Sequence, residues 1–456
     1  MNSSNKLYQS LILLLSVTII FVVLSTVDIS FELLGTKTKK INLLSDVLSQ
    51  GILKVVPMPN ILLTDSIIAK DSIAFAIRKK DPSNILDFET DSASSLSHFF
   101  KALNQLKKTK KGKARIAYFG DSMIEGDLIS QDFRGFMQDY FGGNGVGYVP
   151  ITSIVSGFRT SIHHTFGDWT TYNLIDPKPI HSLGIAGYCF VPIVGNSSSW
   201  VKYSGVSRKH LDKFYQTKLL YGKSAGENNV LINGKSYALS GQAAVNQITI
   251  ESISGLGIIE AKFQCKTAVD VFGFSMESDN GVFVDNFSFR GNSGMPLTNV
   301  SQNVYASTDN CLDGYDLIIL EYGLNAVSPK ITDFSWYEKG MLNVVNHIKS
   351  SFPKASILII SVGDKAYRNN GVYETDPSVP LLIDVQKKLA QKTNTAFWSL
   401  YDAMGGKGSI IKWVDGDTVY ANKDYTHFNF NGSHRVGKLL FTKLMSEYSD
   451  YNRKNK

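Results

Sequence analysis

Short apolar runs that alternate with helix-forming segments constrain the fold of this chain more than any other feature. Each run is four to seven residues long and ends in a polar or glycine-containing turn, as buried strands do. Strands that alternate with helices pack as a parallel sheet with helices on both faces. We therefore predict an α/β domain with an open parallel sheet. The predicted strands span 115–119, 282–287, 316–320, 356–362 and 395–398, and the predicted helices span 92–106, 128–141, 336–350, 379–392 and 432–448.

A stretch of different character interrupts this alternation. Residues 148–280 are rich in Ser, Thr, Gly, Tyr and Val, and runs such as 247–253 and 258–264 alternate apolar with polar residues. Alternation with a period of two is typical of half-buried strands. We predict an all-β module there, inserted into an α/β domain that comprises 91–147 and 281–456.

The N-terminal region has the pattern of a membrane anchor. Residues 7–27 carry no charge, and a helix of that length crosses a hydrocarbon core of about 30 Å. Lys6 precedes the segment and Asp28 and Glu32 follow it, which favours a cytoplasmic N-terminus. We predict an uncleaved signal anchor, with a removed signal peptide as the alternative. Residues 28–90 are irregular and are predicted to form a membrane-proximal stalk, so the remainder is expected to be extracytoplasmic.

The basic charge of the chain is local. The formal net charge is +7, and one short acid-free segment contributes six positive residues to it. Without that segment the chain is nearly neutral, so we expect no nucleic-acid partner. We expect the segment itself to be a solvated lead-in to the first strand. Its positive residues are Lys107, Lys108, Lys110, Lys111, Lys113 and Arg115.

The cysteines and histidines show no metal pattern. Cys189, Cys265 and Cys311 are too far apart in sequence for a metal motif or a disulfide framework. We predict buried free thiols. The alternative is that one pair forms a disulfide bond in an oxidising compartment. The adjacent His163 and His164 have no further ligands at useful spacing, so no metal site and no cofactor are predicted.

A candidate nucleophile stands at the end of the first strand. In Gly120-Asp121-Ser122 a serine sits between a strand and a helix, where backbone N–H groups face the same point as its hydroxyl. Such a serine needs a histidine base and an acid that orients it. Asp424 precedes His427 by three residues shortly before the last helix, so its carboxylate can reach Nδ1 and leave Nε2 for the serine. Loops at the carboxyl ends of parallel strands lie together, so we expect these groups to meet.

Two further turns complete a family pattern. Gly291 follows the second strand, and Gly323-x-Asn325 follows the third. Together with the Gly-Asp-Ser and Asp-x-x-His blocks, and in this order, they resemble the SGNH hydrolases, also called the GDSL esterase/lipase family. The resemblance covers 92–145 and 281–450 and implies a flavodoxin-like, three-layer fold.

The resemblance also implies roles for individual residues. Ser122 would be the nucleophile and would donate its backbone N–H to the oxyanion. Gly291 would add a second backbone N–H, and Asn325 would add its side-chain amide. His427 would be the general base, oriented by Asp424. The mechanism that the family uses requires no metal and no cofactor.

The sequence departs from compact family members in three respects. Ala326 stands where the family often has an acid, and Met123 replaces the leucine of the first block. Asp121 is expected to fix the turn and not to react. The long insertion between the first and second blocks is similar to that of the peptidoglycan and polysaccharide O-acetylesterases, a branch that carries an inserted carbohydrate-binding-like β domain.

These patterns predict a membrane-anchored serine esterase. We expect it to remove O-acetyl groups from peptidoglycan or another extracytoplasmic polysaccharide through an acyl-serine intermediate. One alternative is a polysaccharide O-acetyltransferase that uses the same triad with a membrane-bound O-acyltransferase partner. Another is a non-catalytic glycan-binding protein, while nothing in the insertion suggests the apolar groove of a lipase. The aromatic residues of the module are candidates for stacking on sugars, with core packing as the alternative. They are Trp169, Tyr172, Tyr188, Trp200 and Tyr203.

Overall fold

The structure, a computed structural model, contains two compact units, Met1–Ala74 and Phe75–Lys456. In the first unit the strands β1 (Glu32–Leu33) and β2 (Thr36–Lys37) pair antiparallel. All further elements belong to the second unit. The residues that the structure describes are 32–33, 36–37, 81–88, 94–176, 180–195 and 199–455.

The predicted membrane anchor at 7–27 and most of the predicted stalk at 28–90 lie outside the described residues. Along the described part of the chain, no helix is both long enough and apolar enough to span a bilayer. Anchoring therefore stays a prediction.

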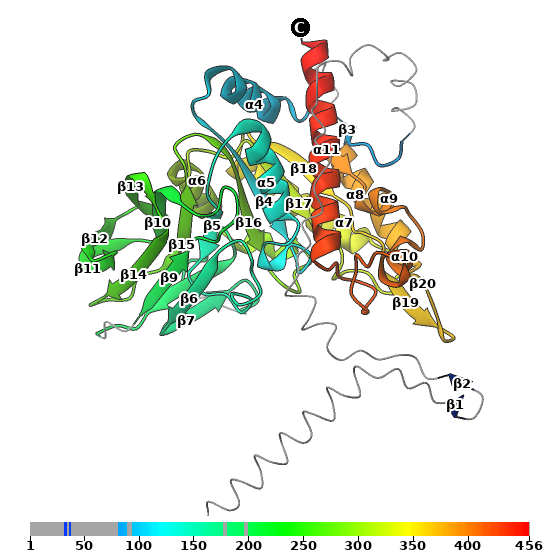
Figure 1. Ribbon diagram of the computed structural model, residues 1–456, viewed down its shortest axis with the longest axis horizontal. Coiled ribbons are helices and arrows are strands. Elements are labelled where there is room, and N and C mark those ends of the chain that lie inside the picture. The colour runs from blue at the N-terminus through cyan, green and yellow to red at the C-terminus, as the bar shows by residue number, and fades with distance from the viewer. Residues whose placement is uncertain are drawn as a thin grey trace, which may run out of the picture. The chain divides into compact units, whose positions relative to one another are not determined.

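A six-stranded sheet forms the centre of the second unit (Figure 1). Its first five strands are parallel, which confirms the sheet predicted from the apolar runs. Nearly every residue of these strands is buried, because helices cover the sheet. In spatial order the strands are β16 (Gly281–Ser288), β4 (Lys113–Gly120), β17 (Leu317–Glu321), β18 (Ser356–Ile360), β21 (Ala396–Trp398) and β3 (Leu86–Asp87).

The edge strand β3 corrects one prediction. It comes from the segment assigned to the stalk, yet Leu86 and Asp87 pair antiparallel with Phe397 and Ala396 of β21. The sheet is therefore mixed at this edge, and the α/β domain begins before residue 91. A two-residue strand carries too little alternation to be recognised from sequence.

Helices cover both faces of the sheet. Neighbouring residues of β4 point to opposite faces, so Tyr118 packs edge-on against Phe133 while Phe119 packs against Tyr305. Phe133 belongs to the layer of α4 (Ser97–Thr109), α5 (Ser130–Phe141) and α11 (Phe430–Lys454). Tyr305 belongs to the layer of α6 (Gln302–Cys311), α7 (Ser335–Ser351) and α8 (Ser378–Lys392). The short elements are η2 (Glu125–Asp127), η3 (Met295–Asn299), β19 (Ala366–Asn369), β20 (Val372–Thr375), α9 (Leu400–Met404) and α10 (Ser409–Asp415).

The insertion is a sandwich of two antiparallel sheets, drawn in teal to green beside the parallel sheet (Figure 1). Side chains such as Val149, Val201 and Phe274 are buried in a core of its own. A parallel sheet with an inserted β module is thus confirmed. One sheet contains β13 (Asn246–Leu256), β10 (Phe214–Tyr221), β15 (Val271–Glu277), β8 (Tyr188–Pro192), β7 (Trp169–Asn173) and β5 (Gly147–Pro150). The other contains β12 (Lys235–Gly241), β11 (Ser224–Ile232), β14 (Ile258–Gln264), β9 (Trp200–Ser204) and β6 (His163–Gly167).

The prediction of a solvated basic segment is wrong for its last members. Lys113 begins β4, and the Arg115 side chain is fully buried. Arg115 Nη1 lies 2.7 Å from Asp285 Oδ2 on β16, and Nη2 bonds to Glu277 on β15. Lys113 Nζ also contacts Glu277, at 2.8 Å. These partners stand far away in the sequence, so a local charge run gave no sign of them.

Candidate active site

The Gly-Asp-Ser turn lies at the carboxyl end of β4, as predicted. A Cβ on Gly120 would lie 3.1 Å from the carbonyl oxygen of Glu321 on the neighbouring strand, so glycine permits this close approach. Asp121 Oδ1 accepts a hydrogen bond from the Met123 N–H at 3.0 Å. This hydrogen bond stabilises the turn that contains Ser122.

The structure brings Ser122, His427 and Asp424 together. Ser122 Oγ lies 2.9 Å from His427 Nε2, and His427 Nδ1 lies 2.7 Å from Asp424 Oδ2. Asp424 Oδ1 also accepts from the backbone N–H of His427 at 3.0 Å. Both residues lie on the loop that precedes α11, and the paired carboxylate assigns the proton of the neutral ring to Nδ1. Nε2 is then free to accept the serine proton.

The environment of Asp424 favours its charged form. Burial alone would raise its pKa, but hydrogen bonds from the backbone and ring of His427 and from the Thr426 N–H lower the pKa below the usual value. A carboxylate that stays ionised stabilises the imidazolium formed when histidine takes a proton. The geometry and the charge state suit general-base chemistry at Ser122.

The loops that carry the predicted oxyanion donors Gly291 and Asn325 contact the nucleophile turn. The Phe289 N–H bonds to the Gly120 carbonyl at 3.0 Å, so the loop that carries Gly291 begins beside the turn. Gly291 has φ +73°, and a Cβ there would meet no atom within 4 Å. Backbone conformation and not crowding within the chain therefore explains the glycine.

Asn325 is placed in an unexpected way. Its Nδ2 donates to Asp121 Oδ2 and to the Asn292 carbonyl, each at 3.0 Å. The two hydrogens of the amide thus tie the loop after β17 to the turn and to the loop after β16. To stabilise an oxyanion as well, one of the two amide hydrogens must be shared between its present acceptor and the oxyanion. The sequence indicated the position of Asn325 but not this tie.

Ser122 opens onto a cleft of about 260 Å³, which we call the active-site cleft. Its lining contains both polar and apolar side chains, and most of them belong to no sequence motif. Arg290 precedes Gly291 and pairs through Nε with Glu125 Oε2 at 2.7 Å. The cleft is lined by Ser122, Met123, Glu125, Leu128, Val155, Phe158, Arg290, Asn422, Asp424, His427 and Phe428.

A buried ion network connects the β module to the nucleophile turn. Asp127 accepts from both terminal nitrogens of Arg134 at 2.8 Å, from Ser130 Oγ at 2.6 Å and from Arg159 Nη2 at 3.2 Å. Burial would raise the pKa of Asp127, but the two guanidinium groups hold it well below its usual value. Arg159 lies in the loop between β5 and β6, so the network ties that loop to η2, which follows the turn. The sequence gave no local signal for this pairing across 32 residues.

Two carboxyl groups lie behind the nucleophile turn. Burial raises the pKa of Asp121 to about 7 and that of Glu321 to about 8. Tyr118 bonds to Glu321 through its hydroxyl, and that bond by itself lowers the pKa of Glu321. Both groups therefore change charge near neutral pH.

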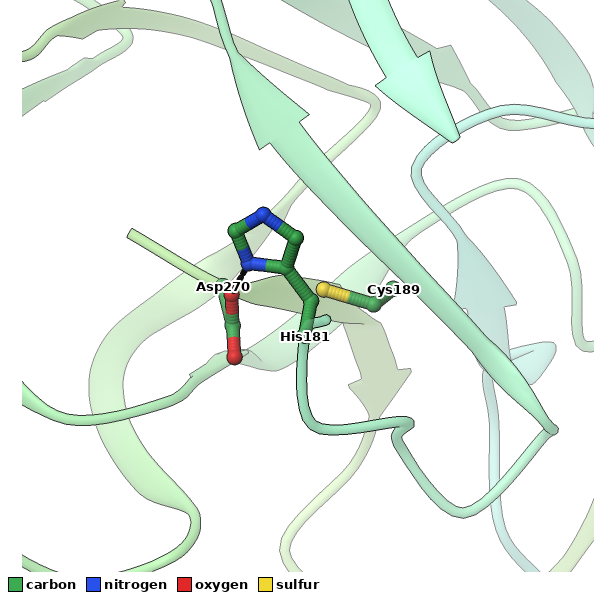
Figure 2. Close-up of side chains that lie close together, drawn as sticks. All are labelled: His181, Cys189 and Asp270. Atoms are coloured by element: carbon green, nitrogen blue, oxygen red, sulfur yellow. Dashed lines mark hydrogen bonds and ion pairs between the residues drawn. The ribbon is translucent and has the colours of Figure 1, made fainter. Parts of the chain in front are cut away.

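A second cluster of polar side chains lies within the β module (Figure 2). His181 Nδ1 is 2.6 Å from Asp270 Oδ1, and one ligand atom each of His181, Cys189 and Asp270 lies within 4.8 Å of the others. These are ligand types that zinc accepts. Burial and then the Asp270 carboxylate raise the pKa of the Cys189 thiol, so the thiol keeps its proton and hydrogen-bonds to that carboxylate. Hydrogen bonding within the trio accounts for the arrangement.

The remaining predictions on cysteine and histidine have clear outcomes. Cys189, Cys265 and Cys311 are buried free thiols, as predicted. His164 is buried with Nε2 2.9 Å from the Ile151 carbonyl, whereas the neighbouring His163 is exposed. The two histidines thus point apart.

The aromatic residues singled out in the module serve its packing. Tyr203 is buried and stacks on His164 with ring centroids 4.7 Å apart. Trp169 packs edge-on against Phe263, and Tyr188 stacks on Phe289. Tyr172 and Trp200 are also at least partly buried. Core packing, the alternative, is what the structure favours for this set.

Comparison with known proteins gives matches in structure alone. No family model and no curated protein sequence matches the chain. A solved structure of a peptidoglycan O-acetylesterase matches with a TM-score of 0.66 and 21% identity, over 80% of this chain and 99% of that chain. A family two carbohydrate esterase mutant from Clostridium thermocellum matches with a TM-score of 0.28 and 11% identity, over 63% and 98% of the two chains. A putative GDSL-like lipase from Parabacteroides merdae reaches 0.28 and 15%, over 36% and 72%. Only the first score is high enough to establish a shared fold.

Proposed function

We propose that this chain, which has the fold of the SGNH hydrolases, is a serine esterase that removes O-acetyl groups from an extracytoplasmic polysaccharide. The observation that carries the proposal is the hydrogen-bonded series Ser122–His427–Asp424 at the carboxyl edge of the sheet. The match to a peptidoglycan O-acetylesterase supports the substrate class, since it spans 99% of that chain. Acetylated peptidoglycan is the first substrate to test.

The first half-reaction acylates the serine. Ser122 Oγ attacks the acetyl carbonyl while its proton passes to His427 Nε2. The carbonyl oxygen becomes an oxyanion that the backbone N–H groups of Ser122 and Gly291 and the amide of Asn325 stabilise. When the tetrahedral intermediate collapses, the bond from carbon to the sugar oxygen breaks. The sugar oxygen takes the proton from His427 and leaves as a hydroxyl group.

The second half-reaction releases acetate. A water molecule attacks the acyl-serine carbonyl, and His427 accepts one of its protons. Collapse of the second tetrahedral intermediate returns that proton to Ser122 Oγ. Throughout, the Asp424 carboxylate holds the imidazole ring and stabilises its charged form. The proposed anchor at residues 7–27 would hold this chemistry outside the cytoplasmic membrane.

The decisive experiment measures acetate release by the wild type and by Ser122→Ala. Substrates are acetylated peptidoglycan and p-nitrophenyl acetate, and circular dichroism checks that the variant folds. We expect the variant to lose both activities and its covalent labelling by a fluorophosphonate. Retained hydrolysis in a folded Ser122→Ala protein would refute the proposal. Acetyl transfer from a donor to the glycan, without acetate release, would show that the acceptor is a sugar and not water.

A further inference from the structure

We propose that the rings of Phe158 and Phe430 form a stacking surface for a sugar ring of the substrate chain, at the mouth of the active-site cleft. The inference rests on the proposed function in so far as the ligand is a glycan. It assigns to the β module a direct part in substrate binding, through a residue outside the aromatic set that the sequence singled out.

The two rings come from distant parts of the chain. Phe158 lies on the loop between β5 and β6, and Phe430 is the first residue of α11. Their centroids are 5.1 Å apart with an interplanar angle of 31°, so the two rings pack against each other as one aromatic pair. Phe158 is 47% exposed and Phe430 is 43% exposed. Exposed aromatic rings that lie together are typical of binding surfaces.

This surface adjoins the reacting groups. Phe158 lines the same cleft as Ser122 and His427. Phe430 follows His427 by three residues, so its position is fixed by the turn that carries the base. A ring that stacks there would belong to the acetylated sugar or to its neighbour in the chain.

The surface is held in place before any ligand binds. A Cβ on Gly126, which has φ +68°, would lie 2.7 Å from Phe158 Cδ1, so the phenyl ring packs closely on that glycine. The next residue, Arg159, is bound to buried Asp127. An aromatic side chain has only two rotatable bonds, and fixing them in advance lowers the entropy lost on binding.

Polar residues in the lining of the same cleft determine what kind of ligand fits. Arg290, whose side chain is 61% exposed, pairs there with the nearly buried Glu125. Asn422 lies in the same lining. A pyranose ring has an apolar C–H face and a rim of hydroxyl groups, which matches a cleft with an aromatic wall and a polar wall. A long acyl chain would cover the Arg290–Glu125 ion pair with methylene groups, and removing such a pair from water is unfavourable.

Ratios of activity on two substrates test the stacking surface. For Phe158→Ala and Phe430→Ala we expect kcat/KM on acetylated glycan, divided by kcat/KM on p-nitrophenyl acetate, to fall about tenfold through a higher KM for the glycan, equivalent to about 1.4 kcal/mol. Phe158→Trp should keep the wild-type ratio, because the larger aromatic ring still stacks on the sugar. Trp336→Ala removes a ring that is 45% exposed on α7 and serves as the matched control. It should leave the ratio at the wild-type value.

The outcomes separate this inference from the proposed function. An equal loss on both substrates, or no change on either, would overturn the stacking surface. A greater loss on p-nitrophenyl butyrate than on the acetate would identify the rings as an acyl-binding wall and would also overturn it. If the wild type released no acetate from glycan, the proposed function would fail. The affinity for glycan would then be compared between Ser122→Ala and the double variant Ser122→Ala/Phe158→Ala. We expect the double variant to bind about tenfold more weakly, and equal affinities would overturn the stacking surface.

Discussion

At the scale of single residues, the carboxylate of Asp424 has the clearest assigned task. It binds the Nδ1 side of His427, and its lowered pKa keeps it charged while the imidazole takes up a proton. Replacing it with an amide preserves the shape of the side chain but removes the charge. The amide NH₂ group can also donate a hydrogen bond to Nδ1. The ring proton would then lie on Nε2, which could no longer accept the proton of the serine hydroxyl.

We therefore expect Asp424→Asn to lower kcat on p-nitrophenyl acetate by roughly 10²–10⁴-fold. Asp415→Asn is the matched control, because Asp415 accepts from the Tyr425 hydroxyl on the same loop without touching His427. Its kcat should stay within a few-fold of the wild type. Similar kcat values for the two variants would contradict the role assigned to Asp424.

Asn325 has two proposed roles, one in catalysis and one in holding loops together, and the sequence motif does not distinguish them. The family resemblance implies an oxyanion donor, while the structure shows an amide already bonded to Asp121 and to the Asn292 carbonyl. Asn325→Ala should lower kcat by roughly 10²–10³-fold, as loss of one oxyanion donor does. Because the tie between loops is also lost, its Tm should fall. A lowered Tm with unchanged kcat would show that the amide serves the structure alone.

Glu321 makes stability depend on pH. Its pKa is raised by burial from 4.5 to about 8, so the native state keeps a proton that the unfolded chain releases from about pH 4.5 upward. The stabilising contribution is thus present below pH 4.5 and is lost as the pH rises to about 8. Glu321→Gln is neutral at every pH and retains a partner for Tyr118.

We expect the free energy of unfolding of the wild type to fall between pH 5 and pH 9 relative to that of Glu321→Gln. Urea titrations at both pH values measure the difference. Asp121, with a pKa of about 7, contributes a decline of the same sign in both proteins, so some decline should remain in the variant. Parallel pH profiles for the two proteins would disprove a raised pKa of Glu321.

At the scale of elements, the unusual backbone after the nucleophile depends on Asp127. Gly126 and Asp127 both have positive φ, at 68° and 67°, and the Asp127 carboxylate binds Ser130, Arg134 and Arg159 around them. The carboxylate compensates two buried guanidinium groups. Removing it would leave both without their partner.

Asp127→Ala should accordingly destabilise the protein by about 3–5 kcal/mol in urea unfolding. Asp139→Ala is the control, since Asp139 is half exposed and pairs with Lys209 at the surface, where an ion pair contributes about 1 kcal/mol or less. Equal losses of stability in the two variants would show that the buried Asp127 network contributes no more to stability than a surface ion pair.

Most helices and buried strands could be predicted because their signal is local. The spacing of Phe133 and Met137 or the continuous run 356–360 needs no knowledge of the rest of the chain. By contrast, Arg115 resembles a surface residue until Asp285 and Glu277 are placed beside it. Phe158 likewise has no marker in sequence, because its importance arises from a loop of the module that folds over a distant turn.

At the scale of the whole molecule, the inserted β sandwich is joined to the α/β domain by more than its two chain connections. Leu183, Ile185 and Phe272 of the module belong to the same apolar core as the strands of the parallel sheet. Arg115 adds an ionic link, since it pairs with Asp285 of the sheet and Glu277 of the sandwich in full burial. The candidate site could be predicted as a set of loop ends, but this connection, which sets the module beside the serine, required the fold.

These apolar and ionic contacts predict that the sandwich, despite a core of its own, unfolds together with the α/β domain. In urea, hydrogen exchange at Leu219 of β10 and at Ile319 of β17 should report one coincident transition in the wild type. Arg115→Ala leaves the buried carboxylate of Asp285 without its cation, whereas Glu277 keeps Lys113 and Lys218. The substitution should lower the free energy of unfolding by about 3–5 kcal/mol at both probes. Lys110→Ala is the control, because Lys110 belongs to the same basic segment but is exposed. Two separate transitions in the wild type, or a loss at Leu219 alone in Arg115→Ala, would show that the sandwich is an independent domain and that its placement beside Ser122 depends on other contacts.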